Sequence, residues 1–105
     1  MDIESMEKML LRGQDSLLLR FGLGGEYLRR DDYEKAIIHL RAALVFDPRH
    51  AAAWRLLGAA LTSAGQVPEA RTAYEEGIRA ADADGHIQAA KEMRVFLKRL
   101  NKPTP

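Results

Sequence analysis

A period of 34 residues constrains this chain more than any other feature of its sequence. Leu23 and Gly24 are repeated 34 positions later as Leu57 and Gly58, and further small and apolar residues recur in phase over 17–84. Repeats of this length are helical or mixed units that stack side by side and bury a continuous core between neighbours. The period therefore predicts a stacked repeat architecture.

The apolar residues inside the period have helical spacing. Trp54, Leu57 and Leu61 are three and four positions apart, which places them on one face of an α-helix. No segment alternates with period two and is rich in β-branched residues, so we expect no strand. The sequence predicts an all-α fold, with helices at 3–12, 16–30, 33–46, 49–64, 68–81 and 86–100.

The predicted helix boundaries follow the prolines and glycines. We expect Asp47 to cap helix 49–64, with Pro48 at its first position, where a missing N–H costs nothing. Gly65 is expected to end that helix in a left-handed conformation, and Pro68 to open the next one.

The repeated residues resemble the tetratricopeptide repeat, a 34-residue helix pair with a known signature. Its first helix carries Trp, Leu, Gly and Tyr, and its second carries Ala, Phe and Ala before a Pro. The matching residues are Leu23, Gly24, Tyr27, Ala36, Leu40, Ala43 and Pro48 in repeat 17–50, and Trp54, Leu57, Gly58, Leu61, Ala70, Tyr74 and Gly77 in repeat 51–84. The chain departs from the signature at Arg20, where Trp is usual, and at Asp82, where Pro is usual.

The flanking segments are also interpreted through the period. Helix 3–12 lies one period before helix 33–46 and therefore resembles the second helix of an upstream unit. Segment 85–100 lies where a third unit would begin, but it has Lys91 and Glu92 in place of Leu and Gly. We interpret it as a capping helix with a polar outer face. The prediction is one domain over 1–105, a superhelical stack of antiparallel helix pairs.

The resemblance implies a concave groove, lined by the first helix of each repeat, that holds a peptide or a partner helix. The implied lining residues are Leu18, Phe21, Gly25, Leu28 and Arg29 in the first repeat and Ala52, Arg55, Ala59, Thr62 and Ser63 in the second. Spacing gives independent support, because Leu18, Phe21 and Leu28 form a second apolar stripe on helix 16–30. Helix 3–12 or a second copy of the chain is an alternative cover for this stripe.

One specialised use of such grooves is disfavoured. Repeats that capture acidic chaperone tails resemble one another in a Lys and Asn clamp. The matching positions here hold Phe21, Gly25 and Leu56, so the resemblance does not extend to that clamp.

The sequence shows no constellation for catalysis, metals or cofactors. There are no cysteines, which excludes disulfides, thiolate zinc sites and a cysteine nucleophile. His39, His50 and His86 share no helix at metal spacing and have no evident carboxylate partner in the sequence. We interpret all three as surface or loop histidines.

Charge and hydropathy limit the classes of partner. The net charge of +1 attracts neither nucleic acid nor anionic lipid strongly. No apolar run approaches the roughly 20 residues that span a bilayer, and the acidic N-terminus does not resemble a secretory signal, so we expect a cytoplasmic protein. Segment 86–105 has five basic residues against Glu92 alone, which we interpret as a solvated face, with nucleic acid or an acidic partner as alternatives.

The leading hypothesis is a non-catalytic protein-interaction module that binds a protein or peptide partner. Leu18, Phe21 and Leu28 would be its apolar anchors and Arg55 its polar one. The alternative is a self-assembling subunit, a homodimer through the apolar stripe or the terminal helices.

Overall fold

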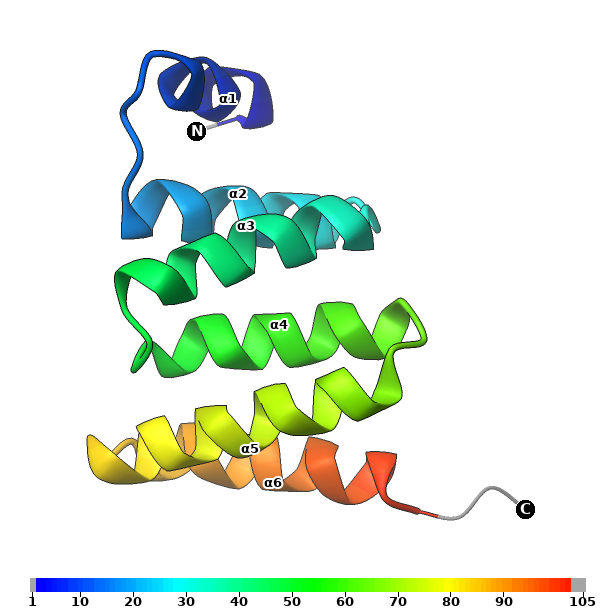
Figure 1. Cartoon of the computed structure of the whole chain (residues 1–105). Helices are drawn as coiled ribbons and strands as arrows, with labels where there is room; N and C mark the ends of the chain where they lie inside the picture. The colour runs from blue at the N-terminus through cyan, green and yellow to red at the C-terminus, as the bar shows by residue number, and fades with distance from the viewer. Residues whose placement is uncertain (1, 103–105) are drawn as a thin grey trace.

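The computed structural model describes residues 2–102, which form six α-helices and no strand (Figure 1). The all-α prediction is confirmed. The helices are α1 (Ile3–Leu11), α2 (Leu17–Arg29), α3 (Tyr33–Phe46), α4 (Ala51–Ser63), α5 (Val67–Ala83) and α6 (Ile87–Leu100). Among the described helices, none has the length and apolar character needed to cross a membrane.

The start of α4 differs from the prediction. The helix begins at Ala51, and its N-cap is His50, whose Nδ1 accepts a hydrogen bond from a backbone amide of the first turn at 3.1 Å. Asp47 instead follows the end of α3, and its carboxylate accepts a hydrogen bond from the Arg49 amide at 3.0 Å. Asp47 and Pro48 therefore belong to the turn between the repeats, because a short Asp side chain satisfies a turn amide as readily as a helix amide.

The repeated glycines mark the positions where paired helices come closest. A Cβ added at Gly24 would lie 2.5 Å from Leu40 Cγ, and one added at Gly58 would lie 2.5 Å from Tyr74 Cε1. No side chain larger than hydrogen fits there, so the glycines set how closely α2 packs on α3 and α4 on α5. This close packing is the physical origin of the 34-residue period.

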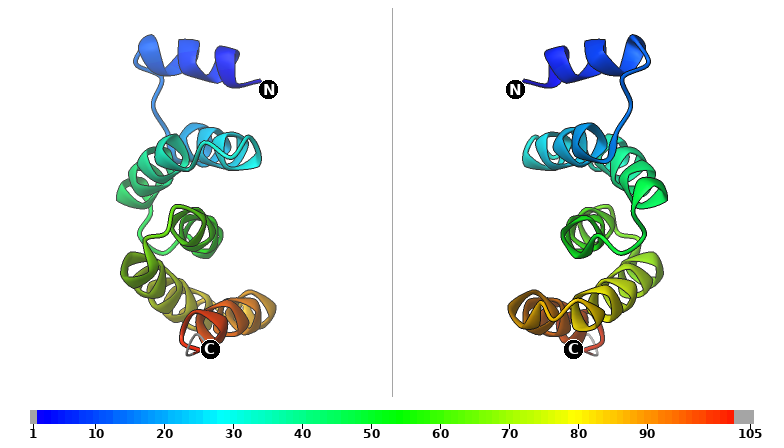
Figure 2. Two further views of the ribbon diagram at one scale, coloured as in Figure 1. Left: turned by 90° about the vertical axis from the view of Figure 1, so that its right-hand side faces the viewer. Right: turned by 90° about the vertical axis from the view of Figure 1, so that its left-hand side faces the viewer.

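The helices stack into a shallow arc with extents of 46 × 32 × 19 Å. Both views of Figure 2 show α2, α4 and α6 on one side of the arc and α3 and α5 on the other. The first helix of each repeat thus lines the concave side, as the resemblance implied.

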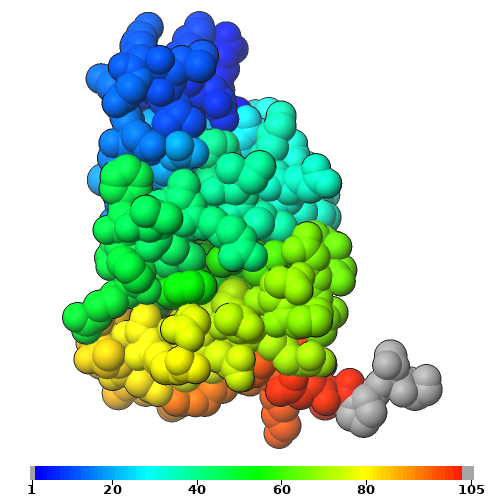
Figure 3. Space-filling view, in the orientation of Figure 1, coloured from blue at the N-terminus to red at the C-terminus, as the bar shows by residue number. Residues whose placement is uncertain are grey.

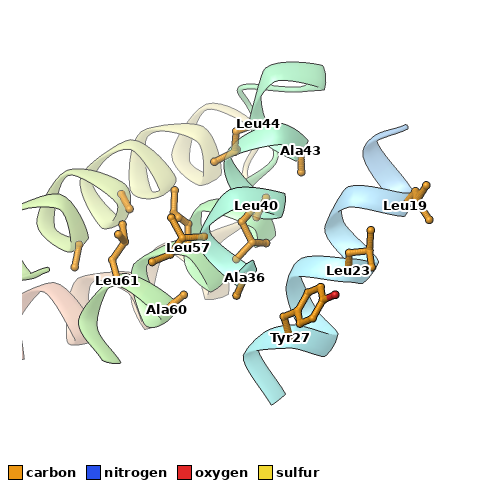
Figure 4. Close-up of a cluster of buried hydrophobic side chains, with 14 of the residues drawn as sticks. Leu19, Leu23, Tyr27, Ala36, Leu40, Ala43, Leu44, Leu57, Ala60 and Leu61 are labelled. Carbon is orange, nitrogen blue, oxygen red and sulfur yellow. The ribbon is translucent and has the colours of Figure 1, made fainter. Parts of the chain in front are cut away.

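The core is continuous along this arc. Leu23, Leu40, Leu57 and Leu61 are completely buried in one cluster and come from three successive helices (Figure 4). A second cluster lies between α5 and α6 around Met93.

Helix α1 lies across the N-terminal end of the stack. Figure 1 shows α1 nearly end-on and the other helices from the side. Figure 2, turned by 90°, shows α1 from the side and the other helices more nearly end-on. In the space-filling view it forms a narrower lobe at this end (Figure 3). The second helix of an upstream repeat would instead run antiparallel to α2, so α1 has a different orientation from the one that the resemblance to helix 33–46 implied.

Helix α6 packs on α5 through Ala90 and Met93, both of which are completely buried. Lys91 and Glu92 lie on the opposite side and are exposed. The face of α6 on which the second helix of a third repeat would pack is thus polar.

Candidate functional site

The concave face of the first repeat is only partly open. Leu18 is 79% exposed. Phe21 is half-buried, and its ring lies 4.9 Å from the ring of His50. A Cβ added at Gly25 would lie 3.8 Å from Leu56, which is ordinary contact and leaves the site open. Helix α1 does not cover Leu18. The alternative that helix 3–12 covers the apolar stripe therefore does not hold at this residue.

The C-terminal half of α2 contributes less to a binding face than the sequence suggested. Leu28 is partly buried against the main core. Arg29 is exposed and forms an ion pair with Glu26 of the same helix at 3.1 Å. Both side chains therefore already have partners within the first repeat.

In the second repeat the predicted lining residues lie in different environments. Thr62 donates its hydroxyl hydrogen to the Gly58 carbonyl one turn earlier at 2.7 Å, so its donor is already used. Ala59 is half-buried and has little side chain to offer. Arg55 is half-buried and lines a cavity between α4 and α6.

This cavity has a volume of about 650 Å³. It lies where the N-terminal turns of α4 and α6 meet the loops before them. Its lining combines small apolar residues with basic and acidic ones, namely Asp47, Arg49, His50, Ala51, Ala52, Arg55, Asp84, His86, Ile87, Gln88 and Ala89.

The charges of the cavity are unequally paired. Arg49 donates to the Asp84 carboxylate at 2.6 Å, and Asp47 accepts from the Arg49 amide. No carboxylate of residues 2–102 forms an ion pair with Arg55. Arg55 lies in the first turns of α4, near the helix N-terminus, which adds partial positive charge beside it.

A family model described as Tetratricopeptide repeat matches residues 21–86. The chain belongs to the tetratricopeptide repeat family. It is 48% identical over 102 residues to the TPR repeat-containing protein PA0015 of Pseudomonas aeruginosa, which covers 97% of each protein. It also resembles the solution structure of protein BPP2914 from Bordetella parapertussis, with a TM-score of 0.82 and 45% identity over 95% of this chain and 87% of that chain.

Part of the lining of this cavity was missed in the sequence. His86 and Ala89 line the cavity and lie one period after Ala52 and Arg55. The 34-residue period was the only feature of the sequence that indicated these two lining residues. Because Lys91 and Glu92 do not match the repeat signature, the predicted lining stopped at the second repeat. The cavity extends to α6 because this helix keeps the position of a first helix even without its signature residues.

The interpretation of His39 was wrong. Its side chain is buried in the first tetratricopeptide repeat, and its Nε2 lies 3.4 Å from a carboxylate oxygen of Glu7. The two residues lie far apart in the sequence and on different helices, so no local spacing indicates the pair.

The basic residues of α6 are exposed, as interpreted from the sequence. Arg94 pairs with Asp82 of α5 at 2.5 Å, and the Arg99 guanidinium lies 5.8 Å from the centre of the Phe96 ring. These contacts give the two arginines local structural partners.

Proposed function

We propose that this chain is a non-catalytic interaction module that holds a segment of a partner protein along its concave side. Tetratricopeptide repeats generally mediate protein–protein interactions. In the proposed complex an apolar side chain of the partner packs on Leu18, and a carboxylate binds Arg55.

The observation that carries this proposal is the pairing of charges in the cavity. Asp84 engages Arg49, which leaves Arg55 as the arginine without an ion pair among the described lining residues. A guanidinium presents a rigid fork of donors that matches a carboxylate. The exposed Leu18 and the Phe21–His50 contact extend this site toward the first repeat.

Affinity capture with charge-changing variants tests the proposal. Arg55→Glu and Leu18→Glu should each weaken capture of the partner from a lysate of the source organism by on the order of tenfold or more. Arg41→Glu and Val45→Glu introduce the same charge on the outer face of α3, where both wild-type residues are exposed, and should leave capture unchanged. Equal capture by all four variants would rule out the concave site.

Leu18 is a better position for this test than Phe21. The Phe21 ring is half-buried against the main core and His50, so a glutamate there would also disturb folding. The side chain of Leu18 is 79% exposed, so its substitution reports on binding.

Self-assembly is the second candidate function, and the outer face of α3 favours it. Ile38 and Val45 are 60% and 82% exposed and lie two helical turns apart on one side of the helix, with Phe46 beside them. Exposed apolar residues grouped in this way are typical of interaction surfaces.

Sedimentation at two protein concentrations tests self-assembly. A concentration-dependent dimer that becomes monomeric in Val45→Glu but not in Leu18→Glu would support the α3 face. A monomer at both concentrations would eliminate this candidate.

A further inference from the structure

Helix α6 lies at the end of the described stack and has neighbours on one side only. Among the described helices it contacts α5 and α4, and Figure 2 shows it at the end of the arc. It holds the position of a first helix, but no second helix follows it within residues 2–102. The side of α6 that such a helix would cover is therefore open.

The open side carries two apolar residues at positions that are buried in the first repeat. Ile87 and Val95 lie two periods after Leu19 and Tyr27. Leu19 and Tyr27 are 6% and 9% exposed, whereas Ile87 and Val95 are 66% and 49% exposed. In both repeats the second helix packs on this side of the first helix, next to the repeated glycines. Ile87 and Val95 thus lack the covering helix that their counterparts have.

Three lysines lie in line with these two residues. Successive members of the set are three or four positions apart, so they lie along one side of the helix. We call this set the open stripe, and it consists of Ile87, Lys91, Val95, Lys98 and Lys102. All five side chains are exposed, and no carboxylate of residues 2–102 forms an ion pair with the three lysines. From Ile87 to Lys98, apolar and basic residues alternate turn by turn.

Positive charge is concentrated at this end of the molecule. Segment 86–105 has five basic residues and one acidic residue, a net charge of +4, so the rest of the chain carries −3 of the total of +1. Arg94 pairs with Asp82 of α5, and the guanidinium of Arg99 lies over the ring of Phe96. The basic groups without such a contact are the lysines of the open stripe, so the stripe is the part of this end that attracts an acidic partner.

Glu92, beside the open stripe, limits how closely a partner approaches. It occupies the place that Gly24 and Gly58 have in the two repeats, where a Cβ would overlap a side chain of the second helix. A helix on α6 cannot come as close as α3 comes to α2, so long side chains must make the contact. Lysines suit this distance, because their apolar stems pack while their ammonium groups stay hydrated.

These features favour one class of partner. A fully apolar helix would bury the lysines without compensation, and single-stranded nucleic acid binds to aromatic platforms that the open stripe lacks. An amphipathic helix on which carboxylates and apolar residues alternate matches both the charge and the spacing of the stripe.

We propose that the open stripe of α6 docks an acidic amphipathic helix of a partner protein, in the place where the second helix of a third repeat would lie. Carboxylates of that helix pair with Lys91 and Lys98, and its apolar side chains cover Ile87 and Val95. Ile87 also lines the cavity between α4 and α6, so the two surfaces meet there, but no lysine of the stripe lines the cavity. The inference therefore goes beyond the proposed function and does not depend on it.

A synthetic helical peptide of about 18 residues tests the docking. At about 1.5 Å per residue it spans the 14 residues of α6. The peptide is alanine-based, has blocked ends, and carries Glu and Leu in alternation along one side at the spacing of the stripe. A second peptide has the same composition, but its Glu and Leu residues are distributed around the helix.

Titration of the isotope-labelled full chain with each peptide, followed by NMR, gives the affinity and the place of binding. The first peptide should shift amides of 87–102 and bind about fivefold or more tightly than the second. No binding, equal affinities for the two peptides, or shifts centred on Arg55 would overturn the proposal.

Variants of the protein separate the stripe from general charge attraction. Lys91→Glu and Lys98→Glu should each weaken binding of the first peptide about threefold or more. Arg41→Glu makes the same change of charge at an exposed residue on the outer face of α3 and should leave the affinity unchanged. Val95→Ser should weaken binding without any change of charge. Equal weakening by all three charge variants, or no effect of Val95→Ser, contradicts the docking of an amphipathic helix.

Anionic membranes and RNA are the competing occupants of the stripe. Co-sedimentation with vesicles of phosphatidylglycerol and phosphatidylcholine, and NMR titration with oligouridylate, test them with the same variants. Neither should bind more tightly than the first peptide, and tighter binding that is lost in Lys91→Glu would assign the stripe to that occupant and overturn the proposal. Failure of the peptide leaves the concave site intact, because Arg55→Glu and Leu18→Glu test that site separately.

Discussion

The ring of Phe21 lies 4.9 Å from the imidazole of His50, the residue that caps α4. Phe21 belongs to the first repeat, and His50 lines the cavity between α4 and α6. This contact joins the apolar and the charged parts of the concave site into one surface. It also gives Phe21 a structural role beside the anchoring role that the sequence suggested.

Phe21→Ala should destabilise the protein. The ring is half-buried and contacts both the main core and His50, so we expect a loss of about 1–3 kcal/mol, below the cost for a fully buried phenylalanine. Urea unfolding followed by circular dichroism measures this loss. Phe46→Ala, at a ring that is 51% exposed, is the control and should cost clearly less.

Gly58→Ala should be destabilising by about 1–3 kcal/mol, because the new methyl group would overlap the Tyr74 ring and force the helices apart. The thermal unfolding midpoint measures the effect. An unchanged midpoint would mean that α4 and α5 separate without cost, and that the period does not arise from this contact.

Gly25→Ala should stabilise the protein, in contrast to Gly58→Ala. The added methyl group meets Leu56 at ordinary contact distance, and alanine favours a helix over glycine by up to about 1 kcal/mol. A higher midpoint is expected in the same measurement. A lower one would indicate that the face between α2 and α4 is packed more tightly than the distance implies.

Asp15→Asn should remove a stabilising effect that depends on pH. Hydrogen bonds from Arg20 lower the pKa of Asp15 below 3.8, so the carboxylate stabilises the fold above that value and loses its effect as the pH falls through the lowered pKa. At pH 7 the free energy of unfolding of the wild type should exceed that of the variant by less than about 1 kcal/mol. In urea titrations the two stabilities should converge as the pH falls below the lowered pKa of Asp15, and a constant difference would contradict the ion pair.

The effects of Tyr27→Phe and Glu7→Gln on the free energy of unfolding should not be additive. The Tyr27 hydroxyl donates to Glu7, and the net value of such a bond is about 0.5–1.5 kcal/mol. A double-mutant cycle by urea unfolding should give a coupling energy of this size. Strict additivity would mean that the bond contributes nothing to the docking of α1.

Sequence reasoning succeeded where a local rule determines the structure. Gly24 and Gly58 must be small because a neighbouring side chain occupies the space next to them, so they preserve the phase of the repeat. It failed at Asp47, because the same residue type caps helices and stabilises turns. The local sequence does not say which backbone amide the carboxylate will meet.

The candidate site was harder to predict than the fold. Arg55 was found from the resemblance to the tetratricopeptide repeat, and it lines the cavity. His86 was missed because α6 lacks the signature while keeping the position of a first helix. The Glu7–His39 pair was missed because it joins residues on different helices, and the crossing of α1 follows from such contacts rather than from the period.

Trp54 packs against both clusters of the core and donates its indole N–H to the Pro48 carbonyl at 2.7 Å. It is the single tryptophan of the chain, so intrinsic emission reports on the junction between the clusters. Stacked repeats need not unfold in one step, because each unit contacts only its neighbours. Because Trp54 contacts both clusters, its emission should change in two steps if the clusters unfold separately and in one step if they unfold together. One native fluorophore therefore measures how far cooperativity extends along the stack.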